Sequence, residues 1–432
     1  MAAAIEAHDN GASVAIFEKM PIVGGNTLNS SAGMNAAEST VQEEEGIEDT
    51  VDAFFEESLE GGHGTNDQDL LRFMVDHSAE GIDWLDSLGI ELSALSFTGG
   101  MSQARAHRPA DGSPVGGYLV EGLYRNVQER DIPVFLNSEV SGLIEDEDSV
   151  TGVFVNVNQT EEAEVLADSV IIAAGGFGSN FDMIAEYNDS ITTDVTTNHE
   201  GATGDGILMA QEVGADVVDM DQIQVHPTVH QENGYLISES IRGEGAILVN
   251  ESGERFSDEM QPRDIMSDLI MEQENQHAYL IGDQELRERA TAVDHYEEEG
   301  LLVTADTIEK LAEKLEMRPD TLKETLANWN EAVDAQEDTD FNRTTAMDYN
   351  LENGPFFATD IAPGIHHTMG GLKINTNTEV LNTEGQAISN LFAAGEVTGG
   401  VHGDNRIGGN AIADIIIFGR QAGRSASENA NN

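Results

Sequence analysis

The first eighteen residues carry the pattern that most restricts the fold of this chain. Residues 2–10 predict a helix, Gly11 predicts its end, and residues 13–18 predict a buried parallel strand that finishes on Glu18. This order matches the second half of a dinucleotide-binding βαβ unit, in which an acid about 20 residues after a GxGxxG loop binds a ribose hydroxyl. On this interpretation the first strand and its glycine loop would precede Met1. An ordinary helix–strand pair with a chance glutamate fits these residues equally well.

Loops of small residues recur along the chain, each beside an expected strand or helix. A buried strand over 169–177 runs into two glycines, and the loop 195–206 is followed by a helix over 207–213. Near the C-terminus, Gly408 and Gly409 open a helix that we expect to reach about Gln421. Such loops allow a backbone to approach a flat ligand closely.

The middle of the chain differs from both flanks. Residues 230–356 are richer in helix formers, and apolar side chains recur there at helical spacing after Pro319, a residue typical of a helix start. Loops rich in glycine and other small residues then return over 357–432. We therefore predict one domain in two parts, 1–229 and 357–432, split by an inserted helical lobe over 230–356.

Composition narrows the classes of function. The chain has 81 acidic against 20 basic residues, a net charge of -61, and such a surface repels phosphate backbones and anionic lipid. We expect no nucleic-acid partner, and the charge predicts a protein kept soluble at high salt. Apolar residues make up 39%, which excludes a disordered acidic tail. No apolar run reaches the roughly 20 residues that span a bilayer.

Cysteine is absent from the sequence. This excludes disulfides, thiolate catalysis, iron–sulfur clusters and covalent haem attachment within this chain.

Arginine and histidine side chains beside the glycine loops are the candidate functional groups. Five of the 20 basic residues are lysine, which leaves 15 arginines in a large excess of acid. A single arginine is nevertheless more often a salt-bridge partner than a catalyst, and a single histidine is usually structural. His366 and His367 are adjacent in an extended segment, so their side chains point to opposite faces and do not share a metal. No metal-ligand spacing occurs on a predicted helix.

A series of motifs carries a family resemblance over essentially the whole chain. The stretches, in order, are Ile16–Lys19, Gly24–Thr27, Gly33–Ala37, Arg105–Pro109, Ala173–Phe177, Thr197–Gly206, Val225–Thr228, Glu239–Gly243, Arg263–Asp264, His366–Gly371, Ala394–Gly403 and Asn405–Ala411. The chain resembles the flavoprotein subunit of the fumarate reductase/succinate dehydrogenase family, and is most similar to the soluble flavocytochrome c type. The resemblance implies an α/β fold, with a Rossmann-like, N-terminally clipped FAD-binding domain split by an α+β capping domain.

The resemblance implies FAD as the cofactor. Residues implied to line it are Glu18, Lys19, Gly25, Asn26, Thr27, Gly33, Met34, Asn35, Val140, Ala174, Gly175, Thr203, Gly204, Asp205, His367, Glu396, Arg406, Gly409, Asn410, Ala411 and Ile412. Asn26 lies near the position where membrane-bound relatives carry a flavin-linking histidine, so the FAD is expected to be non-covalent. The N-terminal dipole of the helix at Asn410 suits an anionic reduced ring.

The resemblance also implies a small dicarboxylate substrate. His366 and Arg406 are implied to hold one carboxylate, and His226 and Ser238 the other. The implied reaction reduces the C=C bond of fumarate by hydride transfer from flavin N5, with Arg263 as the proton donor. Glu239 and Arg242 would supply Arg263 with protons. Cationic groups at both carboxylates would stabilise the developing carbanion.

Alternatives remain at this stage. Related enzymes such as urocanate reductase alter the pocket, and His226 favours a dicarboxylate over urocanate. Another enoate reductase, or an inactive fragment without the pyrophosphate loop, also fits the sequence. Electrons must come from a separate protein or a segment outside this chain, since the chain has no haem motif. The electron donor, the oligomeric state and the cellular location are left open.

Overall fold

The computed structural model describes residues 1–146, 149–157, 161–290 and 292–431. The chain divides into two compact units. The large unit comprises Met1–Thr192, Asn198–Gln224 and His367–Asn432, and the inserted unit comprises Thr193–Thr197 and Val225–His366. The assignment of 1–229 and 357–432 to FAD binding, and of 230–356 to a substrate lid, stays a prediction.

The large unit begins as the sequence indicates, with helix α1 (Ala2–Asp9) and strand β1 (Ile16–Phe17). Gly11 has a φ of 91°, the left-handed conformation that ends a helix. β1 pairs in parallel with β5 (Val134–Phe135) in a sheet of two strands. The prediction that residues 13–18 are buried is wrong, because β1 has one partner strand and its side chains stay partly exposed.

A six-stranded sheet positions two of the glycine loops in the large unit. Its strands are β6 (Ser138–Asp146), β7 (Ser149–Val157), β8 (Glu161–Leu166), β9 (Val170–Ile172), β17 (Glu379–Leu381) and β18 (Ala387–Ala393). β9 and β18 are parallel partners, with Ile172 opposite Ala393. Because parallel strands end at the same edge, the loop containing Gly175 and the loop containing Glu396 begin side by side.

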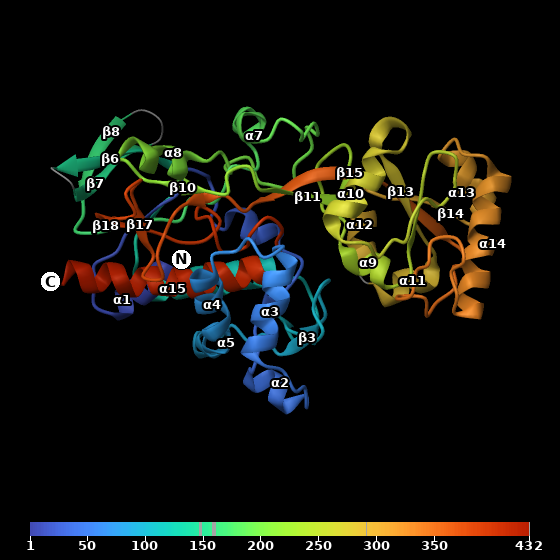
Figure 1. Cartoon of the computed structure of the whole chain (residues 1–432), viewed down its shortest axis with the longest axis horizontal. Coiled ribbons are helices and arrows are strands. Elements are labelled where there is room, and N and C mark those ends of the chain that lie inside the picture. The colour runs from blue at the N-terminus through green and yellow to red at the C-terminus, as the bar shows by residue number, and fades with distance from the viewer. Residues whose placement is uncertain (147–148, 158–160, 291, 432) are drawn as a thin grey trace. The chain divides into compact units, whose positions relative to one another are not determined.

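The long C-terminal helix α15 (Asn410–Ala430) lies along α1 (Figure 1). It extends nine residues beyond the predicted end at Gln421. Gly423 permits this contact, because a side chain there would collide with the main chain of Ala3. The N-terminal helix α1 is thereby packed against the C-terminal helix of the same unit.

The stretch 49–91 forms three separate helices, α3 to α5. The further elements of the large unit are η1 (Gly25–Asn29), β2 (Met34–Asn35), α2 (Thr40–Glu44), α3 (Val51–Gly61), α4 (Gln68–Asp76), α5 (Ser78–Ser87), β3 (Ala94–Ser96), β4 (Ala106–Arg108), α6 (Val115–Glu129), α7 (Phe181–Tyr187), α8 (Asp205–Glu212), β10 (Val217–Val218) and β16 (Gly371–Leu372).

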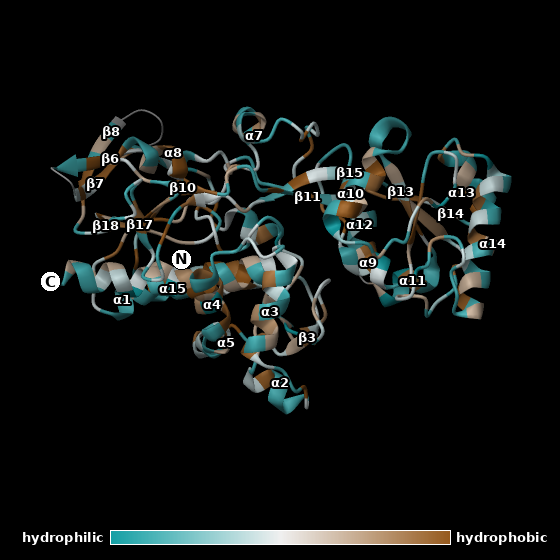
Figure 2. Cartoon of the chain, in the orientation of Figure 1, coloured by the Kyte–Doolittle hydropathy of each residue, from teal (hydrophilic) through white to brown (hydrophobic). Residues whose placement is uncertain are grey.

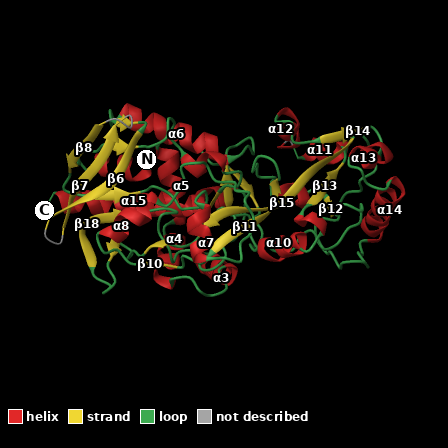
Figure 3. Cartoon of the chain, turned by 90° about the horizontal axis from the view of Figure 1, so that it is seen from above, coloured by secondary structure: helices red, strands yellow, loops and turns green. Residues whose placement is uncertain are grey.

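The inserted unit is built on a five-stranded sheet in the order β11-β15-β13-β12, with β14 paired to β15. The strands are β11 (Ile223–His230), β12 (Ile247–Val249), β13 (Ala278–Gly282), β14 (Val303–Ala305) and β15 (Phe356–Thr368). The helices are α9 (Glu239–Gly243), α10 (Arg263–Met271), η2 (Glu274–Gln276), α11 (Gln284–Arg289), α12 (Ala292–Glu298), α13 (Ile308–Lys314) and α14 (Pro319–Ala335). Figure 3 shows α10 to α14 around the strands. The unit is α+β, so the prediction of a helical lobe from its residues is wrong, because a five-stranded sheet forms its centre. Pro319 starts α14 as predicted.

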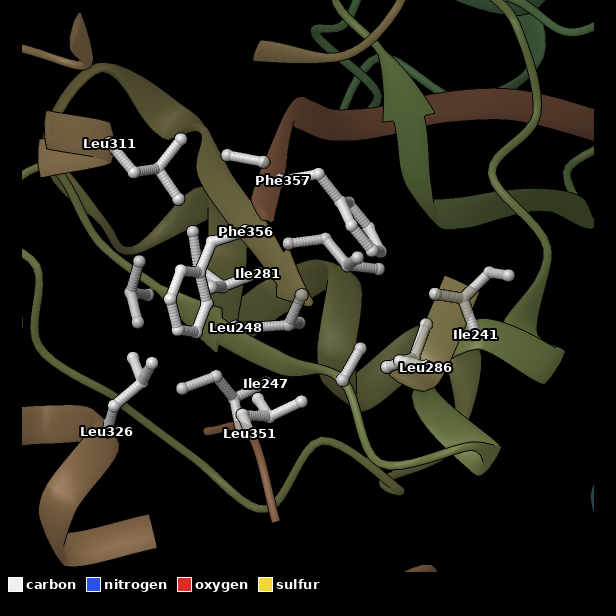
Figure 4. Close-up of a cluster of buried hydrophobic side chains, with 14 of the residues drawn as sticks. Ile241, Ile247, Leu248, Ile281, Leu286, Leu311, Leu326, Leu351, Phe356 and Phe357 are labelled. Atoms are coloured by element: carbon white, nitrogen blue, oxygen red, sulfur yellow. The ribbon is translucent and has the colours of Figure 1, made fainter. Parts of the chain in front are cut away.

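A hydrophobic core holds the inserted unit together. Ile247 and Leu248 of β12, Ile281 of β13 and Phe357 of β15 are at most 3% exposed and point into one cluster (Figure 4). Full burial of each such side chain contributes about 1.5–3 kcal/mol. Figure 2 shows the contrast between the apolar strand β13 and the polar helix α11. Within the described residues, no helix combines the length and apolar character needed to cross a bilayer.

Candidate functional site

The short helix α9 carries two of the predicted functional side chains. Ser238 precedes it, and its Oγ accepts a hydrogen bond from the main-chain N–H of Ser240 at 3.3 Å, which caps the helix. The main-chain N–H of Ser238 donates to the Tyr296 hydroxyl at 3.0 Å. Glu239 and Arg242, three residues apart, then lie on one face of the helix.

Glu239 is the centre of this cluster. Arg263, the first residue of α10, donates from Nε to Glu239 Oε1 at 2.5 Å. The same oxygen lies 3.7 Å from His226 Nε2 and 3.8 Å from Arg242 Nη2. Burial raises the pKa of the Glu239 carboxyl, but Arg263, Arg242 and His366 together outweigh burial and lower this pKa to about 2. Glu239 is therefore a carboxylate throughout the neutral range.

Two histidines from neighbouring strands complete the cluster. His226 on β11 is 1% exposed, and its Nδ1 accepts from the main-chain N–H of Thr228 at 3.3 Å. The neutral ring therefore carries its hydrogen on Nε2, toward Glu239. The rings of His226 and His366 lie edge to face at 5.2 Å, and Thr197 Oγ1 is 2.8 Å from His366 Nδ1.

Arg242 is buried, with 3% of its surface exposed. Burial lowers the pKa of its guanidinium. Two arginines thus share one carboxylate, and two histidine rings lie beside them. Such a positively charged cluster can bind a carboxylate anion and hold a proton next to it.

In the large unit, a second group of predicted residues surrounds Glu396. Asn26 Nδ2 donates to Glu396 Oε2 at 3.2 Å, and the main-chain N–H of Thr368 donates to Oε1 at 3.1 Å. His367 Nδ1 lies 3.5 Å from Glu396 Oε1, and its ring is 5.5 Å from that of His402. Burial raises the pKa of the Glu396 carboxyl. The two adjacent histidines therefore have different surroundings, as the extended backbone predicts.

The start of α15 has features that suit a bound anion or ring system. Gly409 has a φ of 87°, and a side chain there would collide with the amide of Asn35. Asn35 is fully buried, and its Nδ2 donates to Gly408 O and Asn410 Oδ1, both at 2.7 Å. Its Oδ1 has no hydrogen-bond partner among the described residues. A buried acceptor beside a helix N-terminus fits the polar edge of a flavin.

A third group lies at the loop after β1. Lys19 Nζ donates to Asp205 Oδ2 at 2.5 Å and to Thr203 Oγ1 at 2.6 Å. Asp205 begins α8 after Gly204, which has a φ of 80°. Burial raises the pKa of the Glu18 carboxyl, and Glu18 Oε1 accepts from the main-chain N–H of Met20 at 2.8 Å. The acid is thus held by its own loop.

The structure places the remaining predicted cofactor residues in several elements of the large unit. Gly25 and Thr27 lie in η1, Gly33 and Met34 at β2, Val140 in β6, Ala174 and Gly175 after β9, and Ala411 and Ile412 in the first turn of α15. The predicted cofactor residues supply hydrogen-bond donors, acidic acceptors and glycines that allow close approach, and these groups fit FAD. Among the described residues, no one hydrogen bond or ion pair joins them all.

Arg406 is buried in the large unit, with 6% exposed. Its Nη2 donates to Gln224 Oε1 at 3.1 Å, and Gln224 Nε2 donates back to Arg406 O at 2.8 Å. Gln224 therefore holds both the side chain and the main chain of this arginine.

Sequence reasoning missed several of these partners. Thr197, Gln224 and Tyr296 contact predicted residues, and His402 pairs with Asp414 at 3.1 Å. Thr197 and His402 lie inside the resembling stretches, which could have marked them. Gln224 lies one residue before such a stretch, and nothing in the sequence marks Tyr296. The described residues contain no group of three or more acidic, histidine or cysteine side chains able to hold a metal ion.

Comparisons with known proteins identify the family of this chain. The FAD binding domain family matches residues 1–412. The NADH:fumarate oxidoreductase of Klebsiella pneumoniae (strain 342) is 50% identical over all of this chain. This chain covers 46% of that relative, so it spans about half of its length.

A solved structure and a second relative extend the comparison. The open conformation of a flavocytochrome c3 fumarate reductase is 42% identical with a TM-score of 0.89, over 100% of this chain and 76% of that one. The urocanate reductase of Eggerthella lenta is 34% identical over 99% of this chain and 72% of its own length. The chain therefore belongs to the FAD binding domain family and, within it, to the fumarate reductase flavoproteins.

Proposed function

We propose that this chain is the flavin-binding, substrate-reducing part of a reductase that converts fumarate, or a similar unsaturated carboxylate, to its saturated product. The observation that carries this proposal is the cluster of Arg263, Arg242, His226 and His366 around Glu239. The activity is supported by the relatives that this chain matches.

The cofactor in this proposal is non-covalent FAD, which supplies two electrons as hydride to the double bond when bound. Lys19 and Asp205 would hold its adenosine side together with Glu18. Asn35 and the start of α15 would contact its ring. Asn26 is an amide that cannot form the linkage that a histidine forms, and it is engaged with Glu396.

Arg263 is the proposed proton donor to the substrate carbon. The high pKa of an arginine guanidinium opposes general acid catalysis, but a developing carbanion is basic enough to accept this proton. Glu239 holds the Arg263 Nε–H at 2.5 Å and stays ionised, because the pKa of its carboxyl is about 2. The Glu239 side chain is 32% exposed, which gives the proton a route of return from solvent.

Substrate binding is proposed for four polar residues. His226 and Ser238 would bind one carboxylate, and His366 and Arg406 the other. The hydroxyl of Ser238 caps α9 through an oxygen lone pair and lies 2.9 Å from Ser240 Oγ. When Ser240 is the donor of that pair, the hydrogen of Ser238 is left for the substrate. A dianion gains from two arginines that share one carboxylate.

A related enoate or urocanate reductase is the alternative, and the 34% identity to a urocanate reductase supports keeping it. The electron donor would be a separate protein or another part of the full-length protein.

The test uses purified protein supplied with FAD and a reduced viologen dye. We expect a flavin absorption band that gel filtration does not remove, and faster dye oxidation with fumarate than with urocanate or cinnamate. Faster oxidation with urocanate would select the alternative. Colourless protein without turnover would reject the enzyme and favour an inactive fragment.

A further inference from the structure

A buried ionic network lies behind Arg242 in the inserted unit. Glu259, fully buried, accepts from Arg255 Nε at 2.8 Å and Nη2 at 2.9 Å, and from Arg343 Nη1 at 2.9 Å. Arg255 Nη2 also donates to Asp338 Oδ2 at 3.0 Å. We call Arg255, Glu259, Asp338 and Arg343 the balanced network, because its two positive charges match its two negative charges.

The balanced network contacts Arg242 at two points. The Arg242 Nη1 donates to the main-chain oxygen of Glu259 at 2.6 Å. Arg343 Nη2 donates to the main-chain oxygen of Arg242 at 2.9 Å, while Arg343 Nη1 reaches Glu259 and Ala246 O. Arg343 thus holds both the carboxylate of Glu259 and the backbone of Arg242.

These contacts decide where the Arg242 guanidinium lies. Among the residues that the structure describes, Glu259 O is the one hydrogen-bond acceptor of this guanidinium, and Nε has none. The Glu239 carboxylate, at 3.8 Å, is beyond direct hydrogen-bond distance. Helix α9 has only five residues, too few to hold its own conformation without tertiary contacts.

The network is itself rigid. The guanidinium carbons of Arg255 and Arg343 lie 4.8 Å and 4.6 Å from the ring centroid of Trp329, which is fully buried. Arginines stacked on an aromatic face and paired with carboxylates have little freedom to move. The Glu259 carbonyl is therefore a fixed support.

We propose that Arg343, acting through Glu259 and the backbone of α9, is a positioning residue that sets Arg242 at the distance from Glu239 needed for proton return to Arg263. This inference rests on the proposed function. Arg343 touches neither substrate nor cofactor in this proposal. Its contribution is therefore expected in the proton-transfer step and not in substrate binding.

The test compares Arg343→Lys with Arg255→Lys in the FAD-loaded protein. Both residues are buried beside Trp329 and pair with Glu259, but only Arg343 contacts Arg242. We expect both variants to lower Tm. Only Arg343→Lys should lower kcat for fumarate, by about tenfold or more, with KM within about twofold and a larger solvent isotope effect. Loss of kcat in both variants in proportion to Tm would overturn the proposal, as would an unchanged kcat in Arg343→Lys.

A second measurement is independent of turnover. The chain has 15 arginines, so the Nη1–H signal of Arg242, from the group that donates to Glu259 O, can be assigned by NMR in arginine-labelled protein. We expect its hydrogen exchange to accelerate about tenfold or more in Arg343→Lys but not in Arg255→Lys. Equal exchange in both variants would also overturn the positioning role.

The two measurements separate this inference from the proposed function. Wild-type protein that binds FAD but reduces no unsaturated acid would refute the function, and the exchange experiment would still decide whether Arg343 fixes Arg242. Wild-type turnover with no difference between the two variants would refute the inference alone. If Arg343→Lys does not fold, Arg343→Gln keeps one donor for the same comparison.

Discussion

Two clusters of arginine and carboxylate side chains in the inserted unit differ in how their charges balance. In the balanced network, two arginines meet two carboxylates, and all four side chains are at most 6% exposed. Around Glu239, two arginines meet one carboxylate that is 32% exposed, beside two histidines. The charges of the balanced network neutralise one another, whereas the cluster around Glu239 carries a net positive charge that can bind an anion. Charge imbalance beside a partly open carboxylate therefore distinguishes the candidate site from a structural ion network.

The largest expected effect concerns Arg263 in the unbalanced cluster. Arg263→Ala should lower fumarate reduction by about a thousandfold or more, the scale of a lost general acid, while the flavin band is retained. Steady-state dye oxidation and the absorption spectrum measure the two quantities. Arg287→Ala, which breaks surface pairs with Asp294 and Glu297, serves as the control. Retained turnover in Arg263→Ala would refute its role as the acid.

A substitution in the balanced network should lower the stability of the protein. Glu259→Gln leaves two buried arginines with less compensation and should lower the free energy of unfolding by roughly 3–5 kcal/mol. Urea unfolding measures this change, and Glu254→Gln, on an exposed residue, is the matched control. A change below about 1 kcal/mol in the free energy of unfolding would show that the balanced network does not stabilise the inserted unit.

Glu239 should behave in the opposite way, with a larger effect on activity than on stability. Glu239→Gln should lower kcat about a hundredfold, because a neutral amide holds the Arg263 cation more weakly and cannot return its proton. Because folding depresses its pKa to about 2, its contribution to stability is present above pH 4.5 and is lost as the pH falls toward 2. The kcat profile between pH 5 and 8 should therefore show no titration from this carboxylate. Glu244→Gln, at the other end of α9, is the control.

A third cluster of charged side chains extends the comparison to the dependence of stability on pH. His277 lies between Asp360 at 2.6 Å and Glu251 at 2.7 Å. The hydrogen bond to Asp360, assisted by Glu251, raises the pKa of His277 to about 9. Its stabilisation should be complete below pH 6.5 and lost as the pH rises through about 9.

Urea unfolding at pH 6 and pH 10 measures this loss, which we expect to be about 1–2 kcal/mol after solvent screening. His277→Gln should remove the pH difference. The same pH difference in wild type and variant would assign it to other groups.

The smallest expected effect is that of salt, through the charged surface, on the KM for fumarate. The net charge of -61 opposes the approach of a dianion to the positive cluster, and salt screens that repulsion. We expect KM for fumarate to fall a few-fold between low and molar salt. A KM that rises steadily with salt would mean that the local arginines dominate the field. A neutral osmolyte at equal viscosity is the control.

Several features of both units could be predicted from the sequence because their signals are local. Short-range backbone preferences explain the helix–glycine–strand start of the large unit, Pro319 as the first residue of α14 in the inserted unit, and the opposed His366 and His367. The end of α15 could not be predicted, because its packing on α1 extends the helix beyond its amphipathic signal.

In the inserted unit, the motifs located Glu239, Arg242 and Arg263, but not the supports behind them. Arg343 lies 101 residues from Arg242 in the chain, and Tyr296 lies 58 from Ser238. Contacts at such separation depend on how β12, β13 and β15 pair, and short strands of this kind carry little periodicity of their own.

The arginine-capped Trp329 gives the chain an optical property. The sequence has two tryptophans, and each compact unit contains one, Trp84 in the large unit and Trp329 in the inserted unit. Trp329 is fully buried, whereas Trp84 is partly exposed beneath Arg420. Their emission maxima should therefore differ, with Trp329 at the shorter wavelength. Replacing either tryptophan by phenylalanine would leave a single tryptophan, in the other unit, so that the two variants together report the melting of each unit separately.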